Sequence, residues 1–321
     1  MCAQAKVEKM QWFRVMFYNV ENLFDTEDNP HANDNEFLPE GLRRWTPGRY
    51  IHHLRQTARV ITAAGQWETP ALVGMCEVEN DSVVIHLLRR TPLRTQGFRY
   101  CMTRSNDPRG INNVLLYRPD KFRYLGHESR RIRFTNSRRR SRDILHVWGQ
   151  VITGDTLDVF VCHFPSRIGG ERTTEQSRMD AAIHVRRACD SLCRLRRRPN
   201  LVIMGDFNDT PANKSIRALT QAAQSDCKLA NLFADPRLLN AEGSHKYRGV
   251  WAQLDHIMVS RAWKAFLKEG SPQIFNPSFL LTEDKTKRGQ RPKRTYNGAR
   301  YEGGFSDHLP VLADFLLPIP E

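Results

Sequence analysis

The chain alternates short apolar runs with segments of helical periodicity. The apolar runs are rich in β-branched or aromatic residues, and their length is that of a strand buried on both faces. They span residues 13–18, 71–76, 114–117, 157–162, 201–204, 257–259 and 311–316. The pattern therefore predicts at least seven buried strands.

Three segments between these runs have apolar residues at helical spacing. The first starts at Pro47 and closes at Gly65, since proline favours the first helical position and glycine the end. The second covers residues 175–198, and the third starts at Thr210 and Pro211 as cap and first residue. Because strands alternate with helices, the predicted class is α/β, or α+β by some schemes.

The chain has no internal repeat and no linker rich in Gly, Ser or Pro. We therefore expect a single domain over residues 12–317, with short tails at 1–11 and 318–321, and loops at 25–35, 135–142 and 283–300. No apolar run approaches the roughly 18 residues that a membrane crossing needs, which excludes a transmembrane segment. Nothing in the sequence implies a protein partner, and a monomer is expected.

Charge favours an anionic partner. With 49 Lys and Arg against 35 Asp and Glu, the net charge is +14, which attracts polyanions at long range. Basic residues cluster at 130–142, 194–198 and 285–294. Such clusters are ordinarily solvated surface, but residues 285–294 lie shortly before Asp307 in sequence and are placed to overhang a cleft there. Nucleic acid is the expected partner, as substrate.

The seven cysteines are scattered and odd in number, so most are expected to be free thiols. Cys189 and Cys193, four apart, are predicted to share a buried helix face. Residues 1–13 have no apolar signal core, which favours the cytoplasm for the sequence as written. Export to the periplasm or outside the cell stays open if the natural start lies upstream of Met1.

Polar residues mark the ends of the predicted strands. Four runs end in such residues, namely Asn19 with Glu21, Glu77, His163, and Asp206 with Asn208, and two runs are preceded by the pairs Asp255-His256 and Asp307-His308. Each one alone is ordinary turn or cap chemistry. If strands of both directions meet at one sheet edge, these residues converge on one cleft, and their joint occurrence predicts a functional site.

The residue types at these positions suit a hard divalent cation. Carboxylates without cysteine favour Mg²⁺ or Mn²⁺ over zinc. Such an ion beside histidines, amides and an acid is typical of sites that catalyse phosphoryl transfer. The chain contains neither a Gly-x-Ser-x-Gly elbow nor a Walker loop.

Six segments together resemble the motifs of the endonuclease/exonuclease/phosphatase superfamily, which includes pancreatic deoxyribonuclease. They are Phe17-Tyr18-Asn19-Val20-Glu21-Asn22-Leu23, Met75-Cys76-Glu77-Val78-Glu79-Asn80, His163-Phe164-Pro165-Ser166, Met204-Gly205-Asp206-Phe207-Asn208-Asp209, Leu254-Asp255-His256-Ile257 and Phe305-Ser306-Asp307-His308-Leu309-Pro310. The resemblance covers residues 12–317. It implies a four-layer sandwich of two packed mixed β-sheets flanked by helices, as in deoxyribonuclease I.

The resemblance also implies roles for these residues. Glu77 would be the main metal ligand, with Glu21 and Asp307 beside it. Asn19 and Asn208 would hold phosphate oxygens or the attacking water, and Asp206 would orient or deprotonate that water. His308 would contact the phosphate, with its ring fixed by Asp255, and His163 would assist there. Whether Asp206 or His308 is the base stays open.

Three further residues are candidate substrate contacts. Arg167 follows the His163 motif, and Tyr247 and Trp251 precede Asp255, where an aromatic ring can stack on a base or sugar. Core packing is the alternative for Trp251. His163 stands where DNA-repair members have a tyrosine, which disfavours abasic-site repair. Residues 25–49 resemble an insertion of bacterial members.

The leading hypothesis is a Mg²⁺-dependent nuclease of low sequence specificity on DNA or RNA. Its rival is a lipid or small-molecule phosphoesterase of the sphingomyelinase or inositol-phosphate phosphatase type. A third hypothesis is a catalytically silent nucleic-acid-binding domain, against which the set of metal-binding carboxylates argues.

Overall fold

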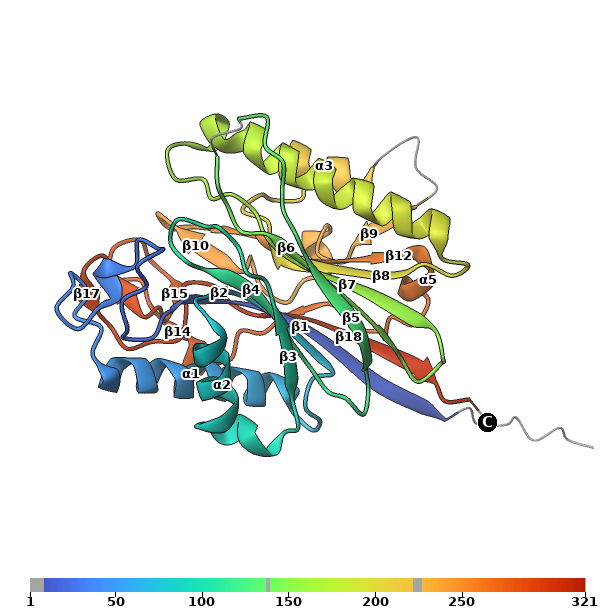
Figure 1. Ribbon diagram of the computed structural model, residues 1–321, viewed down its shortest axis with the longest axis horizontal. Coiled ribbons are helices and arrows are strands. Elements are labelled where there is room, and N and C mark those ends of the chain that lie inside the picture. Colours follow the sequence, from blue (N-terminus) through green and yellow to red (C-terminus); the bar gives the residue numbers. More distant parts are fainter. Residues whose placement is uncertain (1–8, 137–138, 222–226, 321) are drawn as a thin grey trace, which may run out of the picture.

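Two six-stranded mixed sheets form the centre of the molecule. The computed structural model describes residues 9–136, 139–221 and 227–320 (Figure 1). The first sheet has the order β13-β18-β1-β2-β4-β3 and consists of β1 (Met10–Leu23), β2 (Leu72–Val78), β3 (Arg99–Met102), β4 (Asn112–Tyr117), β13 (Gln273–Ile274) and β18 (Val311–Pro318). The second has the order β5-β6-β7-β8-β12-β9 and consists of β5 (Arg123–Arg130), β6 (Ile144–Gln150), β7 (Thr156–His163), β8 (Asn200–Asp206), β9 (Leu229–Asn231) and β12 (Asp255–Ser260).

Helices cover the outer faces of both sheets, which gives the expected four layers. In Figure 1, α1 and α2 lie beneath the first sheet and α3 lies above the second. The helices are α1 (Pro47–Gly65), α2 (Asp81–Arg89), α3 (Glu171–Leu195), α4 (Lys214–Thr220) and α5 (Arg261–Lys264), with 3-10 turns at Asn35–Phe37, Pro92–Thr95, Pro236–Leu238 and Ser278–Leu280. The predicted bounds of α1 are confirmed.

Strand alternation divides the apolar side chains between two cores. Along β7, Val159 and Val161 enter the core between the sheets, whereas Phe160 and Cys162 pack toward α3. Neighbouring side chains of a strand point to opposite faces, so a strand buried on both sides reads as a continuous apolar run. This explains why β7 and β8 were predictable from the sequence.

The sheets approach closely where the candidate site begins. Gly74 of β2 faces Met204 of β8, and a Cβ at Gly74 would lie 2.5 Å from the Met204 sulfur. A larger residue would have to displace the Met204 side chain. The glycine thus allows close packing between the strands that carry Glu77 and Asp206.

A buried ion pair joins the first and last strands. Arg14 and Asp314 are register partners in β1 and β18, and the guanidinium donates from Nε and Nη2 to the two carboxylate oxygens at 2.7 and 2.8 Å. Both residues are nearly inaccessible to solvent. The pairing leaves neither charge isolated in the core.

Two local predictions were wrong. The third helix starts at Lys214 rather than Pro211, because Asn213 Oδ1 accepts from the amide and hydroxyl of Thr210 and closes a separate turn there. The segment 283–300 is also more than a loop. It contributes to two hairpins, β14 (Leu281–Glu283) with β15 (Gln290–Pro292) and β16 (Tyr296–Asn297) with β17 (Arg300–Tyr301).

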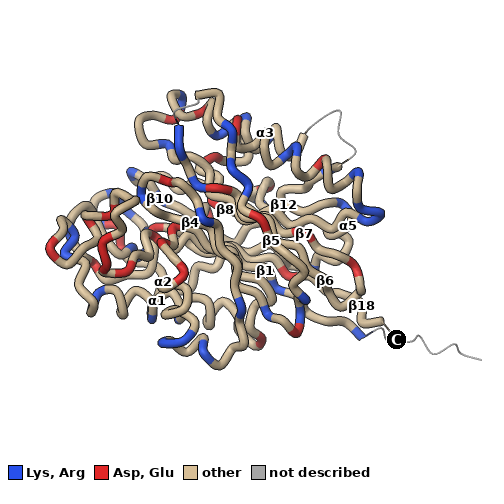
Figure 2. Tube along the Cα trace, in the orientation of Figure 1, with Lys and Arg blue, Asp and Glu red and all other residues tan. Residues whose placement is uncertain are grey.

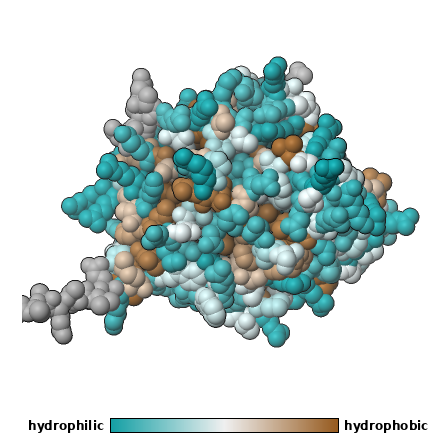
Figure 3. Space-filling model, turned by 180° about the vertical axis from the view of Figure 1, so that it is seen from behind, coloured by the Kyte–Doolittle hydropathy of each residue, from teal (hydrophilic) through white to brown (hydrophobic). Residues whose placement is uncertain are grey.

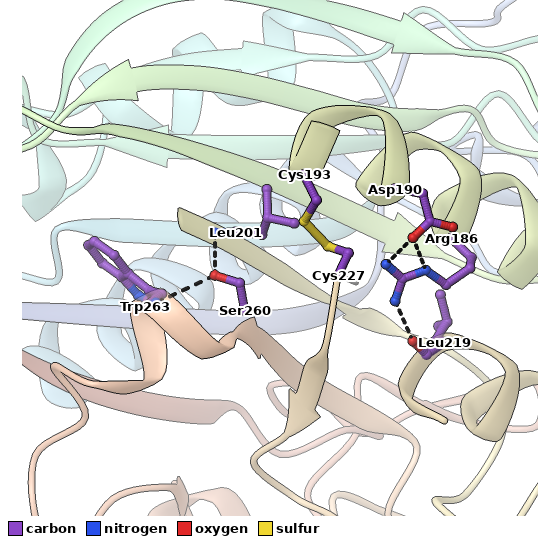
Figure 4. The surroundings of a disulfide bond; sticks show 8 residues. All are labelled: Arg186, Asp190, Cys193, Leu201, Leu219, Cys227, Ser260 and Trp263. Carbon is purple, nitrogen blue, oxygen red and sulfur yellow. Dashed lines mark hydrogen bonds and ion pairs between the residues drawn. A yellow bond between two sulfur atoms is a disulfide. The ribbon is translucent and has the colours of Figure 1, made fainter. Parts of the chain in front are cut away.

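The cysteines differ in part from expectation. Cys76, Cys101, Cys162 and Cys189 are buried free thiols, as predicted, but Cys193 forms a disulfide with Cys227 (Figure 4). The bond ties the end of α3 to the segment before β9. Cys193 therefore forms a cross-link, and it is only partly buried where it packs against the core cluster that contains Cys189.

In the described ranges, no helix combines the length and apolarity that a bilayer crossing requires. On the face seen in Figure 3, the apolar side chains gather in small areas that hydrophilic residues separate.

Candidate active site

The polar strand ends meet at one edge of the two sheets. β1 runs parallel to β2 and β7 parallel to β8, whereas β18 and β12 run antiparallel to β1 and β8. The ends of the first four strands and the starts of the last two consequently share an edge. The register places Asp206 beside both His163 and Asp255. The predicted convergence of strand ends is thus observed.

Four residues at this edge have left-handed backbones. Glu21, Asn22, Glu77 and Asn208 have φ values of 52°, 57°, 64° and 51°, a region that costs a non-glycine residue roughly 1–2 kcal/mol. At Glu21 and Glu77 the strand register also shifts. Such strain collects at functional sites, where the surrounding structure holds it.

Asp206 lies at the centre of the cluster. Asn19 donates from Nδ2 to Asp206 Oδ2 at 3.1 Å, and the Asn208 amide donates to Oδ1 at 2.9 Å. Nε2 of His163 and Nε2 of His308 stand 3.7 and 3.8 Å from Oδ2. Burial, more than any neighbouring charge, raises the pKa of Asp206 to about 7. This carboxyl group can therefore exchange a proton near neutral pH.

His308 is held by an acid on its other ring nitrogen. Nδ1 donates to Asp255 Oδ2 at 2.7 Å, and the Ser244 hydroxyl donates to the same oxygen at 2.5 Å. Burial disfavours a charged ring, but Asp255 and Asp206 prevail and raise the pKa of His308 well above its ordinary value. The ring therefore presents a positively charged Nε2–H beside Asp206.

His163 has the opposite character. Burial, with Arg142 and Arg109 nearby, lowers the pKa of His163 well below its ordinary value. Its Nε2 is 3.8 Å from Glu77 Oε1 and 3.7 Å from Asp206. The neutral ring links the two carboxylates of different sheets.

Carboxylates gather beside this histidine cluster. Glu21 accepts from the Thr295 amide at 2.7 Å, and Glu77 accepts from the Asn22 amide at 3.0 Å. Arg294 reaches Asp307 at 2.8 Å and Glu21 at 3.5 Å. Burial and the charge of Asp307 nevertheless raise the pKa of Glu21 to about 8.

The donor set fits a divalent cation. The raised pKa of Glu21 means that Arg294 only partly offsets the buried negative charge, and a divalent ion bound by oxygen ligands would offset more of it. Two compact ligand groups occur among the described residues, His245 with Asp307 and His308, and Asp206 with Asp255 and His308. The carboxylate oxygens of Glu21, Glu77 and Asp307 lie farther apart than the ligand atoms of either group.

Four site residues were missed or undervalued by sequence reasoning. His245 of hairpin β10 (His245–Tyr247) and β11 (Val250–Ala252) forms a bridge with His308, and the two rings lie 4.6 Å apart. Arg294 was seen only as part of a basic run. Arg109 stands 3.8 Å from Glu77, and Arg142 donates to the Phe164 carbonyl at 3.0 Å. Sequence reasoning missed them because they lie outside the motifs, in loops or hairpins that fold back onto the sheet edge.

The predicted substrate contacts divide into two kinds. Arg167 is engaged by the protein itself, since it donates to the Asn208 carbonyl at 2.6 Å and to Asp209 and Asn213. It therefore shapes the loop after β8. Tyr247 is 63% exposed, whereas Trp251 is partly buried against the core with Lys246 over its ring.

The hairpin that carries Tyr247 joins the basic segment 285–294. Lys246 donates to the Arg288 and Gln290 carbonyls at 2.9 and 3.0 Å. Both hairpins thus lie together beside the candidate site, at the end of the sheets where β10 and β15 are labelled in Figure 1.

Known proteins share this fold over the whole chain. A model of the Endonuclease/Exonuclease/phosphatase family matches residues 14–316. A family protein from Bacteroides thetaiotaomicron has a TM-score of 0.60 and 17% identity over 97% of both chains. A mannosyl-6-phosphatase of the same organism has the same score and identity, over 95% of this chain and 99% of that one.

A humanized TDP2 of D. rerio has a TM-score of 0.58 and 14% identity over 95% of this chain and 98% of that one. No curated protein matches the chain in sequence.

Proposed function

Since the chain belongs to the Endonuclease/Exonuclease/phosphatase family and is a phosphoester-hydrolysing enzyme, we propose that it is a Mg²⁺- or Mn²⁺-dependent phosphodiesterase acting on nucleic acid. The observation that carries the proposal is the arrangement of Asp206, whose oxygens face Asn19, the Asn208 amide, His163 and His308. It places a titratable acid beside a cationic ring and next to a carboxylate cluster. That combination suits in-line attack of water on a phosphate.

In this proposal Asp206 is the base. Its pKa near 7 lets it take a proton from the attacking water. His308 is unsuited to that role because Asp255 and Asp206 keep it protonated. Its Nε2–H instead donates to a phosphate oxygen as negative charge develops there. The water oxygen bonds to phosphorus, the bond to the leaving oxygen breaks, and solvent protonates that oxygen.

The amides orient the reactants. Asn19 and the Asn208 amide fix the two carboxylate oxygens of Asp206, so its remaining lone pairs have fixed directions. Glu21, Glu77 and Asp307 would hold the divalent ion. When bound, that ion neutralises charge on the phosphate oxygens. Hard oxygen ligands favour Mg²⁺ or Mn²⁺ for this position.

Charge supports nucleic acid over a neutral lipid headgroup. Arg109 and Arg142 stand beside His163, and the whole chain has a net charge of +14. A phosphate backbone neutralises such residues with release of counterions. Small phosphomonoesters, sphingomyelin and inositol phosphates are the competing substrates.

A panel of substrates tests the proposal. The purified protein is assayed with Mg²⁺, Mn²⁺ or EDTA on plasmid DNA, RNA, sphingomyelin, inositol phosphates and a sugar phosphate, and Asp206→Asn serves as the inactive control. Metal-dependent cleavage of DNA or RNA that strengthens as salt falls is the expected result. If the protein hydrolyses a lipid or a sugar phosphate but cleaves no nucleic acid, the proposed substrate is wrong.

A further inference from the structure

An arginine-lined hollow lies near the candidate active site. The segment between β5 and β6 and the facing side of α3 enclose a space of about 720 Å³, which adjoins a second of about 420 Å³. We call its guanidinium groups the arginine track: Arg130, Arg131, Arg133, Arg139 and Arg187. Figure 2 shows blue along the chain that runs from β5 toward α3.

Acidic partners for this charge are few. Arg130 lies 3.3 Å from Glu128, and the charge of Arg131 partly offsets the raised pKa of Asp143. Arg131, Arg133 and Arg187 make no hydrogen bond or ion pair with another described residue. Nε of Arg139 is buried without a hydrogen-bond partner. The nearby Asp180 is engaged by Thr135 and Gln176.

The positive charge of the track also acts on a histidine in the same hollow. Burial and the neighbouring Arg178 lower the pKa of Arg139. Burial together with Arg130, Arg187 and Arg133 lowers the pKa of His184, which lines the same hollow. Several guanidinium groups around one hollow suit a ligand with several negative charges.

The sheet register places the track close to His163. Arg130 pairs with Ile144 at the start of β6, and the next residue, Leu145, pairs with Val161 of β7. Two strand spacings of about 4.8 Å therefore separate Arg130 from the end of β7, or about 10 Å. In a duplex each strand advances roughly 3.4 Å along the axis per phosphate, so this distance corresponds to about three nucleotides of a duplex.

The connecting segment is anchored at both ends. The Thr135 amide donates to Asp180 of α3 at 2.8 Å. Arg142 lies 3.4 Å from Asp107 and donates to the Phe164 carbonyl, next to His163. The described parts of this segment are thus held at Thr135 to α3 and at Arg142 to the catalytic edge.

We propose that the arginine track binds the phosphates of a nucleic-acid strand about three or more nucleotides from the scissile bond, so that the enzyme favours long strands over small phosphodiesters. This inference rests on the proposed function for its catalytic part. A sugar phosphate or a dinucleotide would be too short to reach the track.

Binding and cleavage of oligonucleotides test it separately. The test variant is Arg131→Ala/Arg133→Ala/Arg187→Ala. The control is Arg55→Ala/Arg90→Ala/Arg94→Ala, which removes the same charge from exposed arginines around a hollow between α1 and the turn after α2. Anisotropy of a fluorescein-labelled single-stranded 12-mer in EDTA measures binding of the full chain without turnover.

The test variant is expected to bind the 12-mer at least about tenfold more weakly. Its slope of log K against log salt should fall by about 2, since each single-strand phosphate contact contributes about 0.7. The control should bind within about twofold of wild type. With Mg²⁺, the ratio of kcat/KM for the 12-mer to that for a dinucleotide should fall at least about tenfold in the test variant.

Each other outcome is decisive. The proposal for the track is overturned if the test variant binds the 12-mer as tightly as wild type, or if the control loses as much affinity as the test variant. It is also overturned if the wild type does not bind the 12-mer. If the wild type binds but cleaves no nucleic acid with any metal, the proposed function fails, while the comparison of the two variants still decides the track.

Discussion

Asn19 at the end of β1 donates a hydrogen bond to Asp206 at the end of β8, with 3.1 Å between Nδ2 and Oδ2. The bond crosses from one sheet to the other. Because Oδ1 is held by the Asn208 amide, the carboxylate has one orientation before any substrate arrives. The candidate base is thus positioned by residues of both sheets.

Removing the carboxylate should abolish turnover and spare the fold. Asp206→Asn keeps the shape and one hydrogen-bond acceptor but cannot take a proton, so kcat should fall by about 10²–10⁴. Steady-state assays with circular dichroism as a folding check measure this. Turnover within about tenfold of wild type in both Asp206→Asn and Asp206→Ala would exclude Asp206 as the base.

The rate should depend on pH through Asp206. The residue acts as a carboxylate, and its raised pKa of about 7 means that the active form is lost as pH falls through 7. Below that point kcat/KM should drop about tenfold per pH unit, and above it the rate should level off. A small diester substrate avoids effects from strand binding. A rate that is constant between about pH 5 and pH 8 would contradict the assignment.

The protonation of Glu21 should make the stability of the metal-free protein depend on pH. Its pKa of about 8 exceeds the ordinary 4.5, so the folded protein holds a proton that the unfolded chain releases. In EDTA, stability from this group is present below about pH 4.5 and is lost as pH rises toward 8. Thermal melts should show this fall, and Glu21→Gln should reduce it.

Added Mg²⁺ should reverse the loss. At about 100 times its Kd an ion stabilises the folded state by about 2.7 kcal/mol, and Glu21→Gln should weaken that gain. Equal melting temperatures with Mg²⁺ and with EDTA at pH 8 would argue against a metal site at Glu21.

The left-handed backbone of Glu77 gives a stability test that does not use activity. Alanine at φ 64° keeps the strain, whereas glycine relieves it. The free energy of unfolding of Glu77→Gly, measured by urea denaturation, should therefore exceed that of Glu77→Ala by about 1 kcal/mol. The same pair at His163, in regular strand, should give the opposite order.

The Arg14–Asp314 pair should be a major contributor to stability. Asp314→Ala leaves a buried guanidinium without its acid, and such losses are about 3–5 kcal/mol. Urea denaturation measures the change. Arg237→Ala, which breaks an exposed pair with Asp235, should leave the urea midpoint unchanged.

Strands with a continuous apolar run were predictable, whereas β6 was missed although it is largely buried, because His146 and Gly149 interrupt its apolar run. The seven apolar runs all became strands because burial on both faces removes polar residues from them. β5 was missed since most of its side chains are exposed and its sequence shows no alternation. The start of α4 was misplaced because Asn213 and Pro211 both suit a helix start, and only the hydrogen bonds of Asn213 decide between them.

The site was predictable as far as it consists of strand ends. Asp206, Asp255 and His163 follow from register alone, since neighbouring strands bring their ends together. His245 and Arg294 come from hairpins whose return to the edge depends on packing with other loops. No local pattern marks such residues.

The pairing of β1 with β18 also concerns the order in which the chain is made. β1 forms early during synthesis, but the strand that covers one of its edges is the last in the described chain. Until then β1 has unpaired backbone groups on an apolar strand, which is a risk for aggregation. Asp307 and His308 arrive at the same late stage. A chain that stops before Asp307 would thus leave an apolar strand edge uncovered and lack two residues of the site, so aggregation and loss of activity are expected together.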